Sequence, residues 1–281
     1  MKFSFLTYQF CRFPLEYSFK MAREYGFEGV EIWGARPHGY AYDMDKEAIE
    51  AINSWKKQYQ LEVSMFTPEI LAYPYNLSSS IEKERRETLE YLIKSVEITS
   101  LIGTNKMQIT SPHPGYGRDR SEAWSYLVEG VARLAKRAEE VGVSIIMESL
   151  SPSEGSLITT ADDLLDLFKQ VDSKALKGMI DVVPPVIANE PLTEYFDKLG
   201  DKMDYIHICN SDGVTELHMQ LDDPRGVIPM TDMFRVFQRK GYKGWCSLEL
   251  LAPYFKDPEL YLAQAARVIR QICIDLDIKK G

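Results

Sequence analysis

Short apolar runs alternate along the chain with longer segments in which apolar residues recur every three or four positions. The short runs are typical of strands buried on both faces, and the longer spacing is typical of helices with one buried face. Eight strands are predicted: Lys2–Tyr8, Gly29–Trp33, Glu62–Thr67, Lys106–Thr110, Val143–Ser149, Leu176–Val182, Asp204–Cys209 and Trp245–Leu251. A helix is predicted after each: Leu15–Tyr25, Asp45–Gln60, Ile81–Ile102, Arg120–Glu140, Ala161–Val171, Leu192–Leu199, Met230–Lys240 and Pro258–Leu276.

Apolar strands separated by helices indicate an α/β protein with a parallel sheet, either an open doubly wound sheet or a closed barrel. The count of eight pairs favours a (β/α)8 TIM barrel, as does the lack of a GxGxxG turn after the first strand. The chain has 281 residues and no evident linker, close to the roughly 250 residues of one such barrel. We therefore expect a single catalytic domain over residues 1–281.

Composition narrows the possible partners. The net charge is −9 and no Lys/Arg run is present, which argues against nucleic acid and leaves a small neutral or cationic molecule as the easier expectation. The four cysteines are widely spaced and are expected to be reduced thiols of a cytoplasmic protein. No apolar run approaches the roughly 20 residues of a membrane span, so no membrane association is expected.

Four consecutive predicted strands, the fifth to the eighth, each carry a metal-ligand side chain near their carboxyl end: Glu148, Asp181, His207 and Glu249. In a barrel these ends are neighbours on the rim where barrel enzymes keep their chemistry. Taken singly, each residue could be a salt-bridge partner, a loop former or a core histidine, but four such coincidences are less probable than one site. Three carboxylates and one imidazole suit a divalent ion such as Mn2+, Mg2+, Co2+ or Zn2+.

Further polar or aromatic side chains lie near other strand ends and are candidates for contacts with a ligand. They are Tyr8, Glu31, Trp33, Glu69, His113, Glu154 and His218. Glu31 lies two residues before the end of its strand, and we expect it to pair with a basic group inside the barrel.

The carboxylates at the strand ends limit the reactions that the site could catalyse. No G-x-S-x-G, Walker, HExxH or CxxC motif is present, which leaves a metal with flanking carboxylates. Such a site favours proton abstraction beside a carbonyl, where the ion neutralises the enediolate. Glu148 and Glu249 could act as an acid/base pair, one removing a proton and the other returning one on the opposite face, which would invert a stereocentre.

At these residues the whole chain resembles the xylose-isomerase-like barrels that include the ketose 3-epimerases of the D-tagatose 3-epimerase type. The resemblance implies that Glu148, Asp181, His207 and Glu249 bind one divalent ion, with Mn2+ expected first and Co2+, Mg2+, Ni2+ or Zn2+ as alternatives. It also implies that Glu154 contacts a substrate hydroxyl and that the protein is a homo-oligomer.

Longer strings resemble a branch of this family that acts on ketoses with an amino-acid substituent, of the fructoselysine/psicoselysine type. They are GVEIWGARPHGYA at 29–41, TPE at 67–69, YPYN at 73–76, EYFDKLGDK at 194–202 and HICNSDG at 207–213. Pro184 and Gly213 stand where the tagatose-type enzymes have histidine and arginine, which argues against a plain ketose as substrate. The loop 221–226 (LDDPRG) also differs from the usual PGEG-like sequence and could reset substrate choice.

Five alternatives remain open at this point. The chain could be a D-tagatose or D-psicose 3-epimerase, an aldose-ketose isomerase or an inosose dehydratase of the same fold. It could be a non-catalytic sugar-binding barrel with a structural ion. A metal-dependent endonuclease would need more than four histidines and a basic groove, which this acidic chain lacks.

Overall fold

Eight parallel strands form one sheet in the computed structural model, which describes residues 1–278. The strands are β1 Lys2–Phe5, β2 Gly29–Gly34, β3 Glu62–Pro68, β4 Lys106–Ile109, β5 Ser144–Met147, β6 Leu176–Asp181, β7 Met203–Ile208 and β8 Trp245–Leu248. They pair in the order β1-β8-β7-β6-β5-β4-β3-β2, and a bridge between Leu6 and Glu31 links the two ends of this series. The predicted TIM barrel is therefore confirmed.

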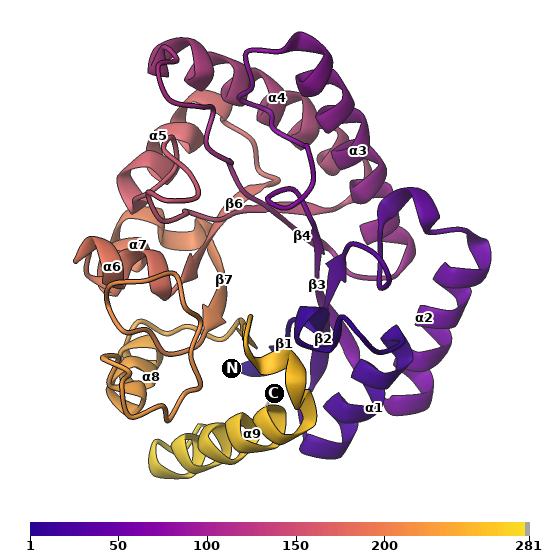
Figure 1. The fold of residues 1–281 in the computed structure, drawn as a ribbon, viewed down its shortest axis with the longest axis vertical. Coiled ribbons are helices and arrows are strands. Elements are labelled where there is room, and N and C mark those ends of the chain that lie inside the picture. Colours follow the sequence, from indigo (N-terminus) through magenta and orange to yellow (C-terminus); the bar gives the residue numbers. More distant parts are fainter. Residues whose placement is uncertain (279–281) are drawn as a thin grey trace.

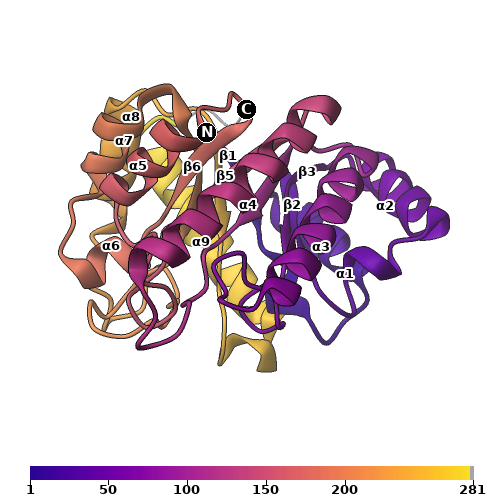
Figure 2. The ribbon, with the colours of Figure 1, turned by 90° about the horizontal axis from the view of Figure 1, so that it is seen from above.

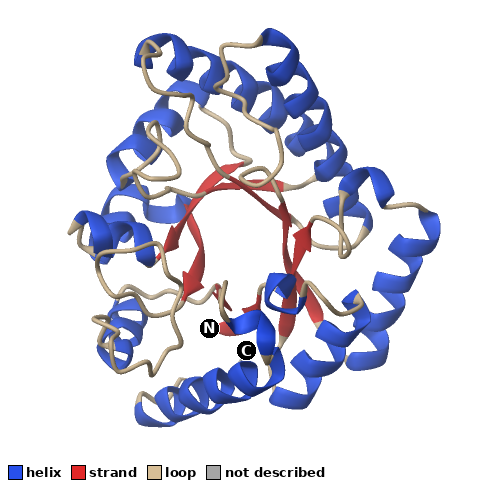
Figure 3. Cartoon of the chain, in the orientation of Figure 1, coloured by secondary structure: helices blue, strands red, loops and turns tan. Residues whose placement is uncertain are grey.

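Helices surround the strands on the outside of this ring (Figures 1 and 3). They are α1 Leu15–Tyr25, α2 Lys46–Tyr59, α3 Glu82–Leu101, α4 Arg120–Val141, α5 Ala161–Val171, α6 Val183–Ala188, α7 Leu192–Leu199, α8 Met230–Arg239 and α9 Pro258–Asp275. The last helix, α9, contacts α1 and so completes the outer layer. Seen at right angles, the helices lie beside the strands and the long loops gather at one end (Figure 2).

The predicted elements differ from the observed ones mainly at strand ends. The first strand ends at Phe5, and Tyr8 lies in a short 3-10 helix, Thr7–Phe10. Helix α6 was not predicted, and no helix was expected between the strand ending at Val182 and the helix beginning at Leu192, because α6 has only six residues. Pro184 and Pro185 lie in the first turn of α6, where the missing N–H is not needed for a helical hydrogen bond.

Residues inside the barrel follow from the two-residue period of strands. Met65, Ile146, Met179, Tyr205 and Trp245 form a buried apolar cluster separate from the larger core that includes the helices. Two residues beyond Ile146, Met179 and Tyr205, the same inward-facing side is occupied by Glu148, Asp181 and His207. Inside the barrel, the apolar cluster therefore lies directly below a layer of polar side chains, which is nearer the carboxyl ends of the strands.

No helix in residues 1–278 is both long and apolar enough to cross a membrane.

Candidate active site

The predicted ligand side chains converge at the carboxyl end of the barrel. Glu148 and Glu249 each come directly after their strands, β5 and β8, whereas Asp181 and His207 lie within β6 and β7. One ligand atom from each of these four residues lies within 4.8 Å of the other three. Glu148, Asp181 and His207 are buried, and the side chain of Glu249 is only 13% exposed. The alternation of each strand therefore delivers four donors into one small space.

The distances within this group fit a shared cation. His207 Nδ1 lies 2.7 Å from Glu249 Oε2, 3.3 Å from Glu148 Oε1 and 3.9 Å from Asp181 Oδ2. Despite this proximity, His207 Nδ1 and Glu249 Oε2 are both buried without a hydrogen-bond partner. Buried polar atoms normally have partners, and nitrogen and carboxylate donors aimed at one point are the donor set of a divalent ion. These four side chains fit the ion that the sequence predicts.

Glu31 holds the imidazole of His207 from the other side. His207 Nε2 lies 3.0 and 3.1 Å from the two carboxylate oxygens of Glu31. The same carboxylate accepts hydrogen bonds from Thr67 Oγ1 at 2.5 Å and from the Tyr205 hydroxyl at 3.0 Å. Metal-binding histidines usually donate their second N–H to such a group, which fixes the ring and its tautomer. Glu31 thus pairs with a basic group inside the barrel as expected, and that group is His207.

Electrostatics in the polar layer reflect the crowding of charges. Burial raises the pKa of Glu148, and burial also raises the pKa of Asp181 well above its usual range. Burial alone would lower the pKa of His207, but Glu249 and Glu31 raise it well above its usual value. For Glu249 burial acts to raise the pKa, yet His207 and His218 hold it well below the usual range. A bound divalent ion would relieve this repulsion between carboxylates.

A cavity of about 220 Å³ opens beside the four ligands. Its wall includes the predicted catalytic residues Glu148 and Glu249 and three of the predicted substrate contacts, Tyr8, Trp33 and Glu69. The rings of Tyr8 and Trp33 pack with their centroids 4.5 Å apart. Aromatic walls of this kind bury the apolar face of a ligand, while the carboxylates fix its orientation.

Glu69 orients Trp33. One carboxylate oxygen of Glu69 accepts a hydrogen bond from Trp33 Nε1 at 2.9 Å. The other accepts from the backbone N–H groups of Leu71 at 2.8 Å and Ala72 at 2.9 Å. Both oxygens are therefore engaged within the protein, and Glu69 supports the wall of the cavity through the indole.

The other two predicted substrate contacts, His113 and Glu154, are not among the residues that line this cavity in the described chain. His113 Nδ1 accepts a hydrogen bond from the Gly115 N–H at 2.9 Å, and its backbone N–H donates to the Glu154 carbonyl at 2.9 Å. Burial, with the negative charges of Glu216 and Glu148, raises the pKa of Glu154 to about 7. Glu154 is therefore close enough to the metal-ligand side chains for the charge of Glu148 to affect its pKa.

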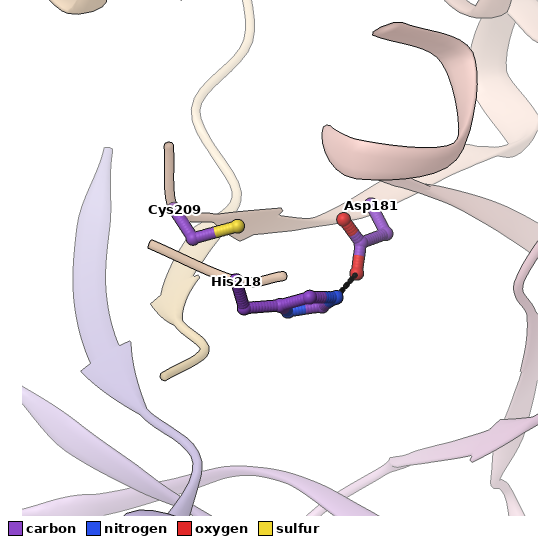
Figure 4. A group of neighbouring side chains, drawn as sticks. All are labelled: Asp181, Cys209 and His218. Atoms are coloured by element: carbon purple, nitrogen blue, oxygen red, sulfur yellow. Dashed lines mark ion pairs between the residues drawn. The ribbon is translucent and has the colours of Figure 1, made fainter. Parts of the chain in front are cut away.

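Three further residues contribute to the site: His218, which the sequence offers as a candidate ligand contact, and Gln108 and Cys209, which the sequence did not assign to it. Gln108 on β4 donates a hydrogen bond from Nε2 to Glu148 Oε2. His218 lies in the loop after β7, 3.4 Å by its Nδ1 from Glu249 Oε2 and 3.6 Å by its Nε2 from Asp181 Oδ2. Cys209 lies next to these side chains (Figure 4). The inward position of Gln108 follows from strand alternation, whereas the return of His218 depends on the fold of a long loop.

Fold and ligand group together define a TIM-barrel protein with a polar metal-ligand cluster at the carboxyl end of its strands. The xylose isomerase-like TIM barrel family matches residues 19–272, and the chain belongs to this family. It is 34% identical over 272 residues to fructoselysine 3-epimerase of Escherichia coli, which covers 97% of this chain and 98% of that protein.

More distant relatives share the fold. The inosose dehydratase of Geobacillus thermodenitrificans is 22% identical over 267 residues, covering 88% of this chain and 86% of that protein. Among solved structures, D-psicose 3-epimerase with D-tagatose from Clostridium cellulolyticum superposes with a TM-score of 0.82 at 18% identity, covering 98% of this chain and 99% of that one. The predicted resemblance to fructoselysine 3-epimerase, and the prediction of an enzyme of the isomerase class, are confirmed.

Proposed function

We propose that this protein is a divalent-metal-dependent epimerase that inverts C3 of a ketose bearing an amino-acid substituent, of the fructoselysine/psicoselysine type. The observation that carries the proposal is the pair Glu148 and Glu249, which line one cavity and belong to one cluster of metal-ligand side chains. The 34% identity to fructoselysine 3-epimerase over nearly the whole chain supports the substrate class.

Glu148, Asp181, His207 and Glu249 would hold the ion, for which Mn2+ is our first choice. When bound, the ion would polarise the substrate carbonyl and neutralise the negative charge of the enediolate. One of the two glutamates would take the proton from C3, and the other would deliver a proton to the opposite face of the same carbon. The net change is inversion at C3, with no oxidant and no second substrate.

Other side chains would orient the substrate and exclude water. The adjoining rings of Tyr8 and Trp33 would cover one face of the sugar or its substituent. Gln108 fixes the direction in which the Glu148 carboxylate points. We propose that Glu154 and His113, outside this cavity, contact the more distant part of the substrate, and that the enzyme works in the cytoplasm as a homo-oligomer.

Product analysis distinguishes this activity from the alternatives. Metal-loaded protein should be incubated separately with fructoselysine, D-tagatose, D-psicose and an inosose, and the products identified by NMR. We expect psicoselysine from fructoselysine, with slower turnover of the plain ketoses. Dehydration of the inosose, or aldose formation from the ketoses, would contradict the proposal and favour the other enzymes of this fold.

Replacing one acid/base group tests the roles of the glutamates. Glu249→Gln should lower kcat by about 10²- to 10⁴-fold, the usual contribution of a positioned acid or base. The metal content of the variant must be measured alongside, and the comparison made at saturating ion. Turnover equal to that of the wild type would favour a non-catalytic sugar-binding barrel.

A further inference from the structure

His218 occupies a defined position that the proposed reaction does not use. His218 is only 4% exposed, and its Nδ1 atom is buried without a hydrogen-bond partner. The neighbouring residue Met219 pairs with Asn210 through two backbone hydrogen bonds of 2.8 Å, which fold the loop back onto the end of β7. The Asn210 side chain also binds the backbone of Leu221 and Ile228. This network holds the imidazole inside the barrel mouth.

Three different metal-ligand side chains meet there. One ligand atom each from Asp181, Cys209 and His218 lies within 4.8 Å of the other two, and all three residues are buried. Figure 4 shows the thiol and the imidazole side by side, with the Asp181 carboxylate beyond them. Asp181 also belongs to the first ligand group, so the two groups share one carboxylate.

The spacing of two of these ligand atoms fits a tetrahedral ion. His218 Nε2 and Asp181 Oδ2 are 3.6 Å apart. An ion at about 2.1 Å from both atoms would subtend an angle of about 118° between them, near the tetrahedral value. The other Asp181 oxygen, Oδ1, accepts a hydrogen bond from the Val183 N–H at 2.8 Å and so holds the carboxylate in place.

Charge balance favours a second cation. Beyond the three carboxylates of the first group, Glu154 and Glu216 approach the same space, and Glu216 Oε1 lies 3.8 Å from His218 Nε2. One divalent ion carries two positive charges, fewer than the negative charges of Glu148, Asp181, Glu249 and Glu216 when these carboxylates are ionised. The thiol distinguishes a metal from an organic cation, because an ammonium group gains little from a sulfur neighbour, whereas Zn2+ prefers thiolate and imidazole ligands.

We propose that Asp181, Cys209 and His218 form a second cation site, for Zn2+ or a similar thiolate-binding ion, adjacent to the first and sharing Asp181 with it. Binding would displace the thiol proton of Cys209 to solvent and form a metal–sulfur bond. Water or a substrate oxygen would complete the coordination. This site does not depend on the proposed epimerase reaction, because its occupancy is read from metal content.

Metal content and cobalt spectroscopy test the proposal on the tag-free chain. After chelation and reloading with excess Zn2+, wild-type protein should retain two equivalents after gel filtration. Cys209→Ser and His218→Asn should each retain one. With Co2+ in place of Zn2+, wild-type protein should show near-ultraviolet thiolate-to-cobalt charge-transfer absorbance, which Cys209→Ser should abolish.

Cys273→Ser is the matched control, because Cys273 is a buried thiol on α9, outside both ligand groups. It should keep two equivalents and the full absorbance. Saturation of the wild type at one equivalent would overturn the proposal and leave His218 as a neighbour of a single ion. Persistence of the absorbance in folded Cys209→Ser would also overturn it. If Cys209→Ser does not fold, His218→Asn decides, since it leaves every thiol intact.

Discussion

Replacement of Glu31 by glutamine tests whether the hydrogen bond between His207 and Glu31 helps the four ligand side chains to bind a metal ion. The Glu31 carboxylate faces three donors, namely His207 Nε2, the Tyr205 hydroxyl and the Thr67 hydroxyl. A carboxylate accepts from all three, whereas the amide of glutamine offers one oxygen and brings two N–H donors. At least one of the three donors would then face another donor, and the His207 ring would lose its fixed tautomer.

The loss of this hydrogen-bond acceptor sets the expected change in metal affinity. Removing the partner of a metal-binding histidine typically weakens metal affinity by about 10- to 100-fold, or about 1.4–2.8 kcal/mol. Glu31→Gln should therefore raise the Kd for Mn2+ by that factor, although Glu31 touches no ion. Isothermal titration calorimetry of chelator-treated protein at fixed pH measures the change, and circular dichroism checks that the variant is folded.

Two further variants serve as comparisons for the change in Kd caused by Glu31→Gln. Tyr205→Phe removes one donor to Glu31 and leaves the His207 contact, so its Kd should change less than that of Glu31→Gln. Glu129→Gln removes an exposed carboxylate whose ion-pair partner, Arg133, is 3.9 Å away, and should leave the Kd unchanged. A Kd for Glu31→Gln within twofold of wild type in a folded protein would refute this role for Glu31.

Three other predictions concern pH, substrate and stability. In metal-free protein, Glu154 has a folded pKa of about 7 against a usual 4.5, so its contribution to stability is complete below pH 4.5 and is lost as pH rises through 7. The difference in Tm, wild type minus Glu154→Gln, should accordingly decrease as the pH is raised from 4.5 to 8. A difference in Tm that stays constant over this range would argue against this pKa. Trp33→Leu should raise KM for the ketosamine about 3- to 10-fold with a smaller change in kcat, because it removes an aromatic ring that packs beside Tyr8 in the cavity wall; an unchanged KM would exclude a substrate contact. Thr160→Ala removes the capping box of α5 and should lower Tm by about 2–4 °C in scanning fluorimetry, whereas an unchanged Tm would mean that the cap contributes little.

Much of the barrel could be predicted from the sequence because its signals are local. The predicted bounds of the helices at 15–25, 161–171 and 192–199 coincide with α1, α5 and α7. The four ligands could be located because strand ends in a parallel barrel meet on one rim, so four strands that each end near a ligand imply a cluster.

Residues that act through the fold of a loop were less predictable. Cys209 was expected only to be a reduced thiol, and the sequence does not reveal that the loop beyond it folds back. That fold depends on the Asn210–Met219 pairing and on the packing of Tyr254, whose hydroxyl accepts from the Gln220 N–H. The 3-10 turn at Tyr8 was also missed, because KFSFLTY has a continuous strand-like composition. In both cases long-range contacts override the local pattern.

The most direct test of the proposed function is the fate of the C3 hydrogen. Metal-loaded protein should be incubated with fructoselysine in deuterated water, and the recovered substrate and product analysed by NMR and mass spectrometry. Proton removal and return through Glu148 and Glu249 predicts deuterium at C3 of psicoselysine, with the exchange lost after chelation and restored by adding the ion. Fully metal-loaded, folded protein that forms psicoselysine with the C3 hydrogen retained, or that causes neither exchange nor product formation, would contradict the account.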